Sequence, residues 1–159
     1  MWLHLNNNSL HGELPLSLNF QKLLILDLGE NRLSGAIPSW KNDTFPELQI
    51  LRLRGNMLNG TAPSNLCQFA KLQILDLANN SLRGAIPRCI GNITGMALDT
   101  KVLSNRTGTA INGTKQWNQE DVKQVIKGRE LDYTKNLVLL TNLDLSNNRL
   151  DGLKVRSPQ

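Results

Sequence analysis

Five polar side chains recur at matching places in this chain, each of them between two leucines. His4, Asp27, Arg52, Asp76 and Asp144 are the middle residues of Leu-x-Leu triplets, at intervals of 23, 25, 24 and 68 residues. Alternate residues of a short strand point the same way, so the leucines face inward and the middle residue faces solvent. We therefore expect one exposed column whose chemistry is ion pairing or ligand contact.

Two interpretations of this column remain open. Arg52 lies between Asp27 and Asp76, which predicts a lateral ladder of ion pairs across neighbouring strands. Exposed pairs of this kind contribute about 0–1 kcal/mol. Alternatively, Arg52 and Arg54 form a forked basic spot for an acidic group of a ligand.

Catalytic, metal-binding and nucleic-acid-binding motifs are absent from the sequence. It contains no Gly-rich phosphate loop, no Gly-x-Ser-x-Gly and no His-Glu-x-x-His. The net charge of +5 comes from scattered basic residues, and aromatic residues make up 4%, so there is no basic stripe or stacking platform. We expect a binding protein that is not an enzyme, has no cofactor and has no nucleic-acid partner.

The chain has two cysteines, Cys67 and Cys89, which follow Pro63 and Pro87 by four and two positions. They lack the further spaced Cys or His partners that a metal site needs. If they lie on adjacent coils about 4.8 Å apart, a disulfide is geometrically plausible. Two buried free thiols are the alternative.

Seven Asn-x-Ser/Thr triplets indicate an exported glycoprotein. Chance alone would give about two, and attached glycans need exposed positions in a secreted chain. The seven acceptors are Asn7, Asn42, Asn59, Asn79, Asn92, Asn105 and Asn112.

The leucine triplets belong to a longer pattern, Leu-x-Leu-x-x-Asn-x-Leu-x-Gly, which is written five times. Its asparagines are Asn8, Asn31, Asn56, Asn80 and Asn148. A period of 20–29 residues with this pattern is the signature of leucine-rich repeats. The Asn amide can satisfy backbone groups left open by the bend in its own coil and in the next. One coil cannot bury its leucine face alone, so the coils must stack into a solenoid.

The residues at the end of each repeat indicate which type of leucine-rich repeat is present. The glycine of the pattern suits a bend with permissive backbone angles, and a proline such as Pro38 or Pro87 then ends the extended segment. This Leu-x-Gly-x-(Leu/Ile)-Pro ending resembles the plant extracellular leucine-rich repeat, in which a second short strand follows the concave one. Ala62 departs from the branched aliphatic residue of that family. The resemblance implies an α/β-type repeat solenoid with short parallel strands on the concave face and few helices.

An insert interrupts the repeats. The asparagines of the fourth and fifth repeats are 68 residues apart, and the intervening segment has no repeat pattern. We therefore expect repeats in 1–94, an island insert in 95–135, a final repeat in 136–153 and a divergent tail in 154–159. Branched residues around Gly128 predict a short strand or hairpin within the island.

The order of these segments is similar to that of plant receptor-like proteins, and most similar to the ethylene-inducing xylanase receptor-like group. The similarity rests on Ile86 to Asn92, the polar insert, and the run from Lys127 to Lys135 before a further repeat. It implies an extracellular domain of an immune receptor that recognises a microbial protein or peptide through the concave face and island. Signalling would pass through partner receptor kinases. It also implies that Lys127 and Tyr133 contact the ligand or anchor the island on the solenoid.

Other functions remain open. One is a secreted inhibitor of a microbial cell-wall enzyme, similar to the polygalacturonase-inhibiting proteins, and another is an island-containing piece of a receptor kinase. The sequence shows no signal peptide and no run of 18 apolar residues. We therefore expect a fragment of a longer plasma-membrane receptor, whose membrane span lies outside this chain, or a truncated non-functional product.

Overall fold

The computed structural model describes residues 1–96, 122–126, 129–133 and 141–151. The chain forms two compact units, one of Met1–Met96 with Asn142–Gln159 and the other of Ala97–Thr141. The first unit contains the repeats and is described first; the second is described by itself below.

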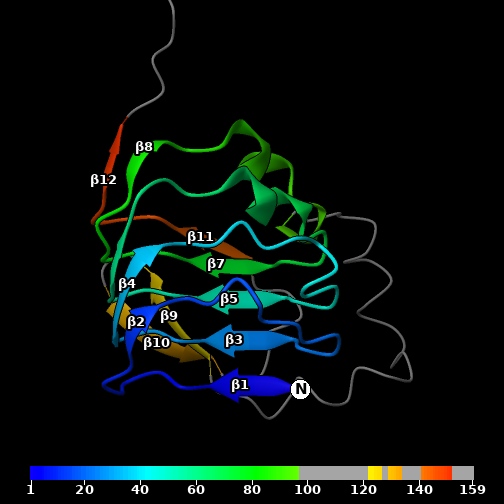
Figure 1. Ribbon diagram of the computed structural model, residues 1–159, viewed down its shortest axis with the longest axis horizontal. Coiled ribbons are helices and arrows are strands. Elements are labelled where there is room, and N and C mark those ends of the chain that lie inside the picture. Colours follow the sequence, from blue (N-terminus) through cyan, green and yellow to red (C-terminus); the bar gives the residue numbers. More distant parts are fainter. Residues whose placement is uncertain (97–121, 127–128, 134–140, 152–159) are drawn as a thin grey trace, which may run out of the picture. The chain divides into compact units, whose positions relative to one another are not determined.

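A five-stranded parallel sheet runs through the first unit, with one strand from each repeat (Figure 1). The register aligns the first leucine of each motif, so that Leu26 pairs with Leu51 and Leu51 with Leu75. We number the coils one to five in the order of the strands that they contribute to this sheet. These strands are β1 (Trp2–His4), β3 (Ile25–Asp27), β5 (Ile50–Arg52), β7 (Ile74–Asp76) and β11 (Asn142–Asp144).

The fifth coil stacks directly on the fourth, although the insert separates them in sequence. Leu143 of β11 lies opposite Leu75 of β7 in the same parallel register as the earlier pairs. The stack of coils therefore continues without a break from the fourth repeat to the fifth. The repeat solenoid predicted from the sequence is confirmed.

A second strand follows in each coil, after the asparagine of the motif. These strands are β2 (His11–Glu13), β4 (Arg32–Ala36) and β6 (Met57–Asn59) in one parallel sheet, and β8 (Arg83–Ala85) and β12 (Arg149–Asp151) in another. The proline of the repeat lies two to four residues beyond the end of the strand in coils one to four, as expected for a residue without an N–H to pair. This second strand agrees with the plant extracellular type of repeat.

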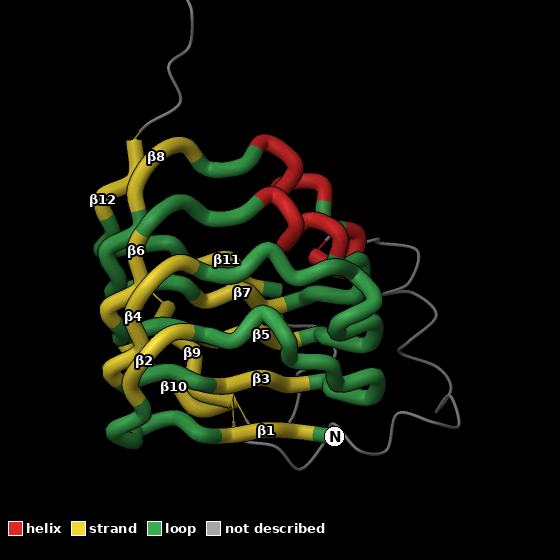
Figure 2. The backbone as a smooth tube through the Cα atoms, viewed as in Figure 1, coloured by secondary structure: helices red, strands yellow, loops and turns green. Residues whose placement is uncertain are grey.

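Helical structure in the described residues is limited to short 3-10 segments (Figure 2). They are η1 (Ser64–Gln68), η2 (Arg88–Asn92) and η3 (Thr94–Met96). Pro63 and Pro87 immediately precede the first two, where a fixed φ suits the entry into a helical turn. No helix in the described part of the chain is long and apolar enough to cross a membrane.

The core lies between the sheets and the returning segments of the coils. The motif leucines of the middle coils, such as Leu51, Leu53 and Leu58, are fully buried. An aromatic cluster adds to them, with Phe45 edge-on to Trp40 at 5.3 Å between ring centroids and tilted against Phe69 at 6.1 Å. The indole N–H of Trp40 donates to the Pro15 carbonyl at 3.1 Å, which ties coil two to coil one.

The motif asparagines form a ladder of hydrogen bonds between coils. Asn56 Oδ1 accepts from the Leu33 N–H of the preceding coil at 2.9 Å, and its amide donates to the Leu28 carbonyl of that coil at 3.0 Å. The same amide also donates to Leu53 and Arg54 within its own coil. Coils two, four and five repeat this arrangement through Asn31, Asn80 and Asn148. The expected bonds within the asparagine's own coil are confirmed, whereas the neighbour that it bonds is the preceding coil and not the next one.

The residue before each motif asparagine has a left-handed backbone. This position is occupied by Asn7, Glu30, Gly55, Asn79 and Asn147, with φ between 50° and 64°. Asparagine and glycine adopt this region most readily, so Glu30 is the unusual member. Its carboxylate lies 3.6 Å from Nε of Arg54, so a glutamate at this position forms an ion pair with the next coil.

The second unit contains an antiparallel hairpin among its described residues. Strands β9 (Val122–Ile126) and β10 (Arg129–Tyr133) pair from Ile126 with Arg129 to Val122 with Tyr133. The hairpin predicted around Gly128 is therefore present. Lys127, which the family resemblance singled out, lies outside the described residues, and Tyr133 is placed as the last residue of β10.

Cys67 and Cys89 form a disulfide between coils three and four, with their Cα atoms 5.8 Å apart. Both side chains are half-buried, and the helices that carry them, η1 and η2, lie side by side. The alternative of two buried free thiols does not apply in this structure.

Replacing Cys89 by serine is expected to lower the free energy of unfolding by about 3 kcal/mol, because the bond closes a loop of moderate length in the unfolded chain. Urea denaturation of the oxidised protein and of Cys89→Ser measures the difference. The parent protein under reducing conditions is the control and should match the variant; equal stability of all three would contradict the prediction.

Candidate functional site

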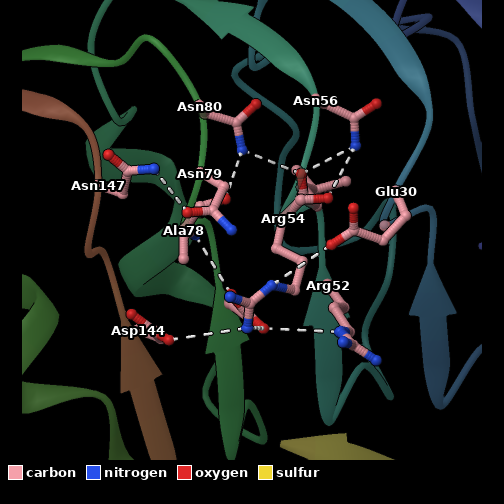
Figure 3. A network of polar contacts seen from close by, with 12 residues as sticks. Glu30, Arg52, Arg54, Asn56, Ala78, Asn79, Asn80, Asp144 and Asn147 are labelled. Atoms are coloured by element: carbon pink, nitrogen blue, oxygen red, sulfur yellow. Dashed lines mark hydrogen bonds and ion pairs between the residues drawn. The ribbon is translucent and has the colours of Figure 1, made fainter. Parts of the chain in front are cut away.

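A network of charged side chains occupies the face of the five-stranded sheet (Figure 3). Arg52 Nη1 lies 3.5 Å from Asp27 Oδ2, and Arg52 Nε lies 3.5 Å from Asp76 Oδ2. The predicted ladder of Asp27, Arg52 and Asp76 is therefore present.

Arg54 extends the network in a way that the sequence did not reveal. Its Nη1 lies 3.1 Å from Asp76 Oδ2 and 3.8 Å from Asp144 Oδ2, while its Nε faces Glu30. Asp76 is thus shared by two guanidinium groups, and Arg54 contacts carboxylates from three other coils. Among the described residues, the network has two guanidiniums and four carboxylates, a formal charge of −2 in a chain of net charge +5.

The aspartates of the network also stabilise their own coils. Asp27, Asp76 and Asp144 each use Oδ1 to accept the backbone N–H two residues later, at 3.0 Å, 3.2 Å and 3.0 Å. Such a local bond fixes the carboxylate while its second oxygen faces the neighbouring coil. The recurrence of aspartate in this column was the signal in the sequence, although the local bond itself was not predicted.

The burial of the network differs from the prediction. Asp27, Arg52, Arg54 and Asp76 are 7%, 4%, 5% and 1% exposed, so the expectation of a solvent-facing column with weak surface pairs is wrong for these residues. A buried ion pair follows different energetics: desolvation opposes it, and loss of one partner leaves an uncompensated buried charge. His4 is exposed and Asp144 is intermediate, so the column remains accessible only towards its two ends.

The alternative prediction is a forked basic spot in which Arg52 and Arg54 bind an acidic group of a ligand. In the structure, both arginines already pair with carboxylates of the chain. Both guanidiniums face carboxylates of the chain itself and are shielded from solvent. An acidic ligand group would have to displace those carboxylates and meet a network with an excess of negative charge. The accessible members are His4, Asp144 and Glu30, whose side chain is 42% exposed.

Burial raises the pKa of Asp76 above its usual value of 3.8, against the opposing effects of Arg54, the Ala78 N–H and Arg52. The folded state therefore binds the Asp76 proton more tightly than the unfolded chain does. The proton-linked part of the stability that Asp76 contributes is greatest below pH 3.8 and is lost as the pH rises through the folded-state pKa. The bond to the Ala78 N–H and the pairing with the two arginines are separate contributions.

A pH titration of stability tests this direction. The free energy of unfolding of the parent protein, minus that of Asp76→Asn, is expected to fall as the pH rises from 3.8 through the folded-state pKa and then to level off. Thermal unfolding of both proteins over this range provides the measurement. Asp144→Asn is the matched control at the equivalent position of coil five. A difference that grows with pH would mean that the arginines outweigh burial.

The five described acceptors of the Asn-x-Ser/Thr triplets are all exposed: Asn7, Asn42, Asn59, Asn79 and Asn92. Asn79 has a particular geometry, because its Oδ1 accepts from Asn147 Nδ2 at 2.8 Å. An N-linked glycan attaches at Nδ2 and would leave this bond in place. Asn105 and Asn112 lie outside the described residues.

No group of three or more His, Cys, Asp or Glu side chains is placed to hold a metal ion within the part of the chain that the structure describes. The charged residues of the network are instead arranged in ion pairs with one another.

Comparison with known proteins identifies the repeats independently. The Leucine Rich Repeat family model matches residues 47–69, 71–93 and 139–159. Receptor-like protein EIX2 of Solanum lycopersicum is 44% identical over 140 residues, and Receptor-like protein EIX1 of the same plant is 39% identical over 142 residues. Each alignment covers 83% of this chain and 13% of the relative, so the chain spans about an eighth of the length of these relatives.

Solved plant ectodomains share the fold. The BIR2 ectodomain from Arabidopsis thaliana is 38% identical with a TM-score of 0.56, over 59% of this chain and 49% of that chain. The Arabidopsis receptor kinase HAESA, solved with the peptide hormone IDA and the co-receptor SERK1, is 33% identical with a TM-score of 0.55, over 58% of this chain and 15% of that chain.

Proposed function

The chain belongs to the plant leucine-rich-repeat receptor-like proteins of the EIX group, and we propose on that premise that it recognises a microbial protein or peptide as part of an extracellular immune receptor. The observation that supports this most directly is the continuous parallel sheet with a charged network across its face. Such a surface offers many side chains at fixed spacing, which suits an extended partner better than a small molecule.

The proposed contact residues are the accessible ones at the ends and edge of the network. His4, Glu30 and Asp144 come from coils one, two and five, while the buried members between them hold the face in shape. Lys127 and Tyr133 remain proposed contacts of the island.

The proposed setting is the outside of the plasma membrane, with receptor kinases as signalling partners of the longer receptor. The complex of HAESA with a peptide hormone and a co-receptor supports this setting by similarity of fold. Glycans on the exposed acceptors fit the same compartment.

Peptide mapping of the chain secreted from plant cells is expected to find glycans at Asn7, Asn42, Asn59, Asn79 and Asn92, because each is exposed. Enzymatic release of the glycans in heavy-oxygen water marks each occupied Asn by conversion to labelled Asp. Asn31 and Asn56, which are not in acceptor triplets, serve as unmarked controls. Absence of glycans from all five sites would contradict the extracellular assignment.

Binding of a purified fungal xylanase to the immobilised full chain tests the recognition proposal. We expect measurable binding that weakens about tenfold or more in His4→Glu and in Glu30→Lys, because a misplaced charge at a contact opposes docking. Met57→Lys, at an exposed position on the second sheet, is the control and should bind as the parent does. Binding that none of the concave-face variants changes would overturn the proposed surface.

The same experiment distinguishes the receptor function from the second candidate function, that of a secreted inhibitor. The receptor proposal expects the bound xylanase to keep its activity on xylan. Loss of enzyme activity in proportion to binding would instead favour the inhibitor, which uses a similar repeat surface.

A further inference from the structure

Asn59 and the glycine that follows it lie on the surface of coil three, at the point where the second sheet divides. Asn59 is the last residue of β6, and both residues are exposed. Strands β2, β4 and β6 form one sheet, whereas β8 and β12 form another, so the pairing of the second strands is interrupted directly beside β6. Coils two and four flank coil three, so neighbours on both sides set this environment.

The main-chain nitrogen of Gly60 is accessible. The Gly60 carbonyl accepts from the Arg83 N–H at 2.7 Å, but within the part of the chain that the structure describes no acceptor is placed for the Gly60 N–H. With φ at 72°, Gly60 has no side chain to shield this nitrogen, and a Cβ built there would meet the Ala36 Cβ at 3.5 Å. The glycine in the same place of coil two differs, because Gly35 lies inside the paired strand β4 and the Glu13 side chain covers it.

We propose that Asn59 is a site of spontaneous deamidation, which proceeds through a cyclic imide formed with Gly60. The deprotonated Gly60 nitrogen attacks Cγ of Asn59, a bond forms between these two atoms, and the bond from Cγ to Nδ2 breaks with release of ammonia. Water then opens the imide at one of its two carbonyls and gives aspartate or isoaspartate, so no oxidant or reductant is consumed. Glycine favours the first step because it has no Cβ to hinder the nitrogen and its main chain rotates readily.

Glycosylation is a competing modification of the same residue. Asn59, Gly60 and Thr61 form one of the Asn-x-Ser/Thr triplets. An N-linked glycan is attached at Nδ2, the atom that deamidation releases, so a glycan on Asn59 blocks the reaction. This protection rests on the proposed extracellular function, whereas the deamidation of the unglycosylated residue does not.

The product alters a contact between coils three and four. Isoaspartate lengthens the main chain between Asn59 and Gly60 by one carbon atom, just after the point where Asn59 pairs with Ala36 of β4. Gly60 therefore shifts relative to Arg83, whose N–H donates to its carbonyl. Conversion to either product also removes the glycan acceptor.

Peptide mapping by mass spectrometry tests the proposal on the unglycosylated full chain with its disulfide intact, incubated at mildly alkaline pH. Replacement of the amide NH2 by OH raises the mass of each converted peptide. We expect Asn59 to convert about tenfold or more faster than Asn79, which is also exposed but is followed by a residue with a side chain. Equal rates at the two residues would contradict the proposal.

Gly60→Asn is the matched variant. Asparagine also adopts a left-handed backbone, and the distance to Ala36 leaves room for its Cβ, so we expect the fold to be kept, as far-UV circular dichroism will show. The added side chain should slow conversion at position 59 to the rate of Asn79. An unchanged rate in this variant would overturn the proposed role of the bare nitrogen.

A second Asn-Gly pair separates the effect of sequence from that of structure. Asn112 and Gly113 lie outside the described residues, and the peptide map resolves them from Asn59. Conversion of Asn112 without conversion of Asn59 would overturn the proposal, because the fold would then protect Asn59.

Thr61→Val tests the protection by the glycan in protein secreted from plant cells. Valine keeps the shape of threonine but lacks the hydroxyl that the acceptor triplet requires. We expect Asn59 to stay unconverted in the parent protein and to convert in Thr61→Val. Equal conversion in both would show that no glycan protects Asn59, which would count against the extracellular assignment and not against the reaction itself.

Discussion

Replacing Asn56 by alanine is expected to lower the free energy of unfolding by about 3 kcal/mol or more, because buried backbone groups lose their hydrogen-bond partner. The Asn56 side chain serves the Leu33 N–H and the carbonyls of Leu28, Leu53 and Arg54. These groups lie inside the stack, where water cannot replace the amide. Urea denaturation followed by circular dichroism measures the change.

Asn8→Ala is the matched control for this prediction. Asn8 is the same motif residue in coil one, but it is exposed, and within the described residues its side chain makes two bonds, both to backbone carbonyls. We expect a loss of no more than about 1 kcal/mol, because water can reach the groups left behind. Equal losses would show that burial of the ladder is not what makes Asn56 important.

Replacing Asp76 by alanine is expected to destabilise the fold by about 3–5 kcal/mol, which is the cost of leaving buried charges without their partner. Asp76 is 1% exposed and lies between Arg52 Nε and Arg54 Nη1, at 3.5 Å and 3.1 Å. Without Asp76, each of the two guanidiniums loses one carboxylate partner, and the Ala78 N–H loses its hydrogen-bond acceptor. Chemical denaturation at neutral pH gives the measurement.

A double variant identifies the origin of that loss. If orphaned charge is responsible, Asp76→Ala combined with Arg54→Met should lose less stability than the sum of the two single variants. Asp144→Ala is the control, because its carboxylate is more exposed and lies 3.8 Å from Arg54. A loss in Asp144→Ala as large as that in Asp76→Ala would mean that position in the column, and not burial, sets the energy.

The repeat geometry was predictable from the sequence because each coil depends on neighbours at a fixed distance along the chain. The spacing of Asn31 and Asn56 placed them in one ladder, and the spacing of Asp27 and Arg52 placed them in one column. Once coils stack at strand spacing, residues at equivalent positions must meet. The hairpin around Gly128 followed from its branched residues in the same local way.

The packing of the coils determines how the charged side chains of the concave face pair and how far they are buried. No pattern in the sequence indicated that Arg54 contacts carboxylates of three other coils, or that Arg52 and Asp76 are buried. A repeat period fixes which strand position a residue occupies, but the direction of a long side chain and its exposure depend on packing with residues far along the chain. The left-handed backbone of Glu30 is of the same kind, since its pairing with Arg54 appears only when coils two and three are side by side.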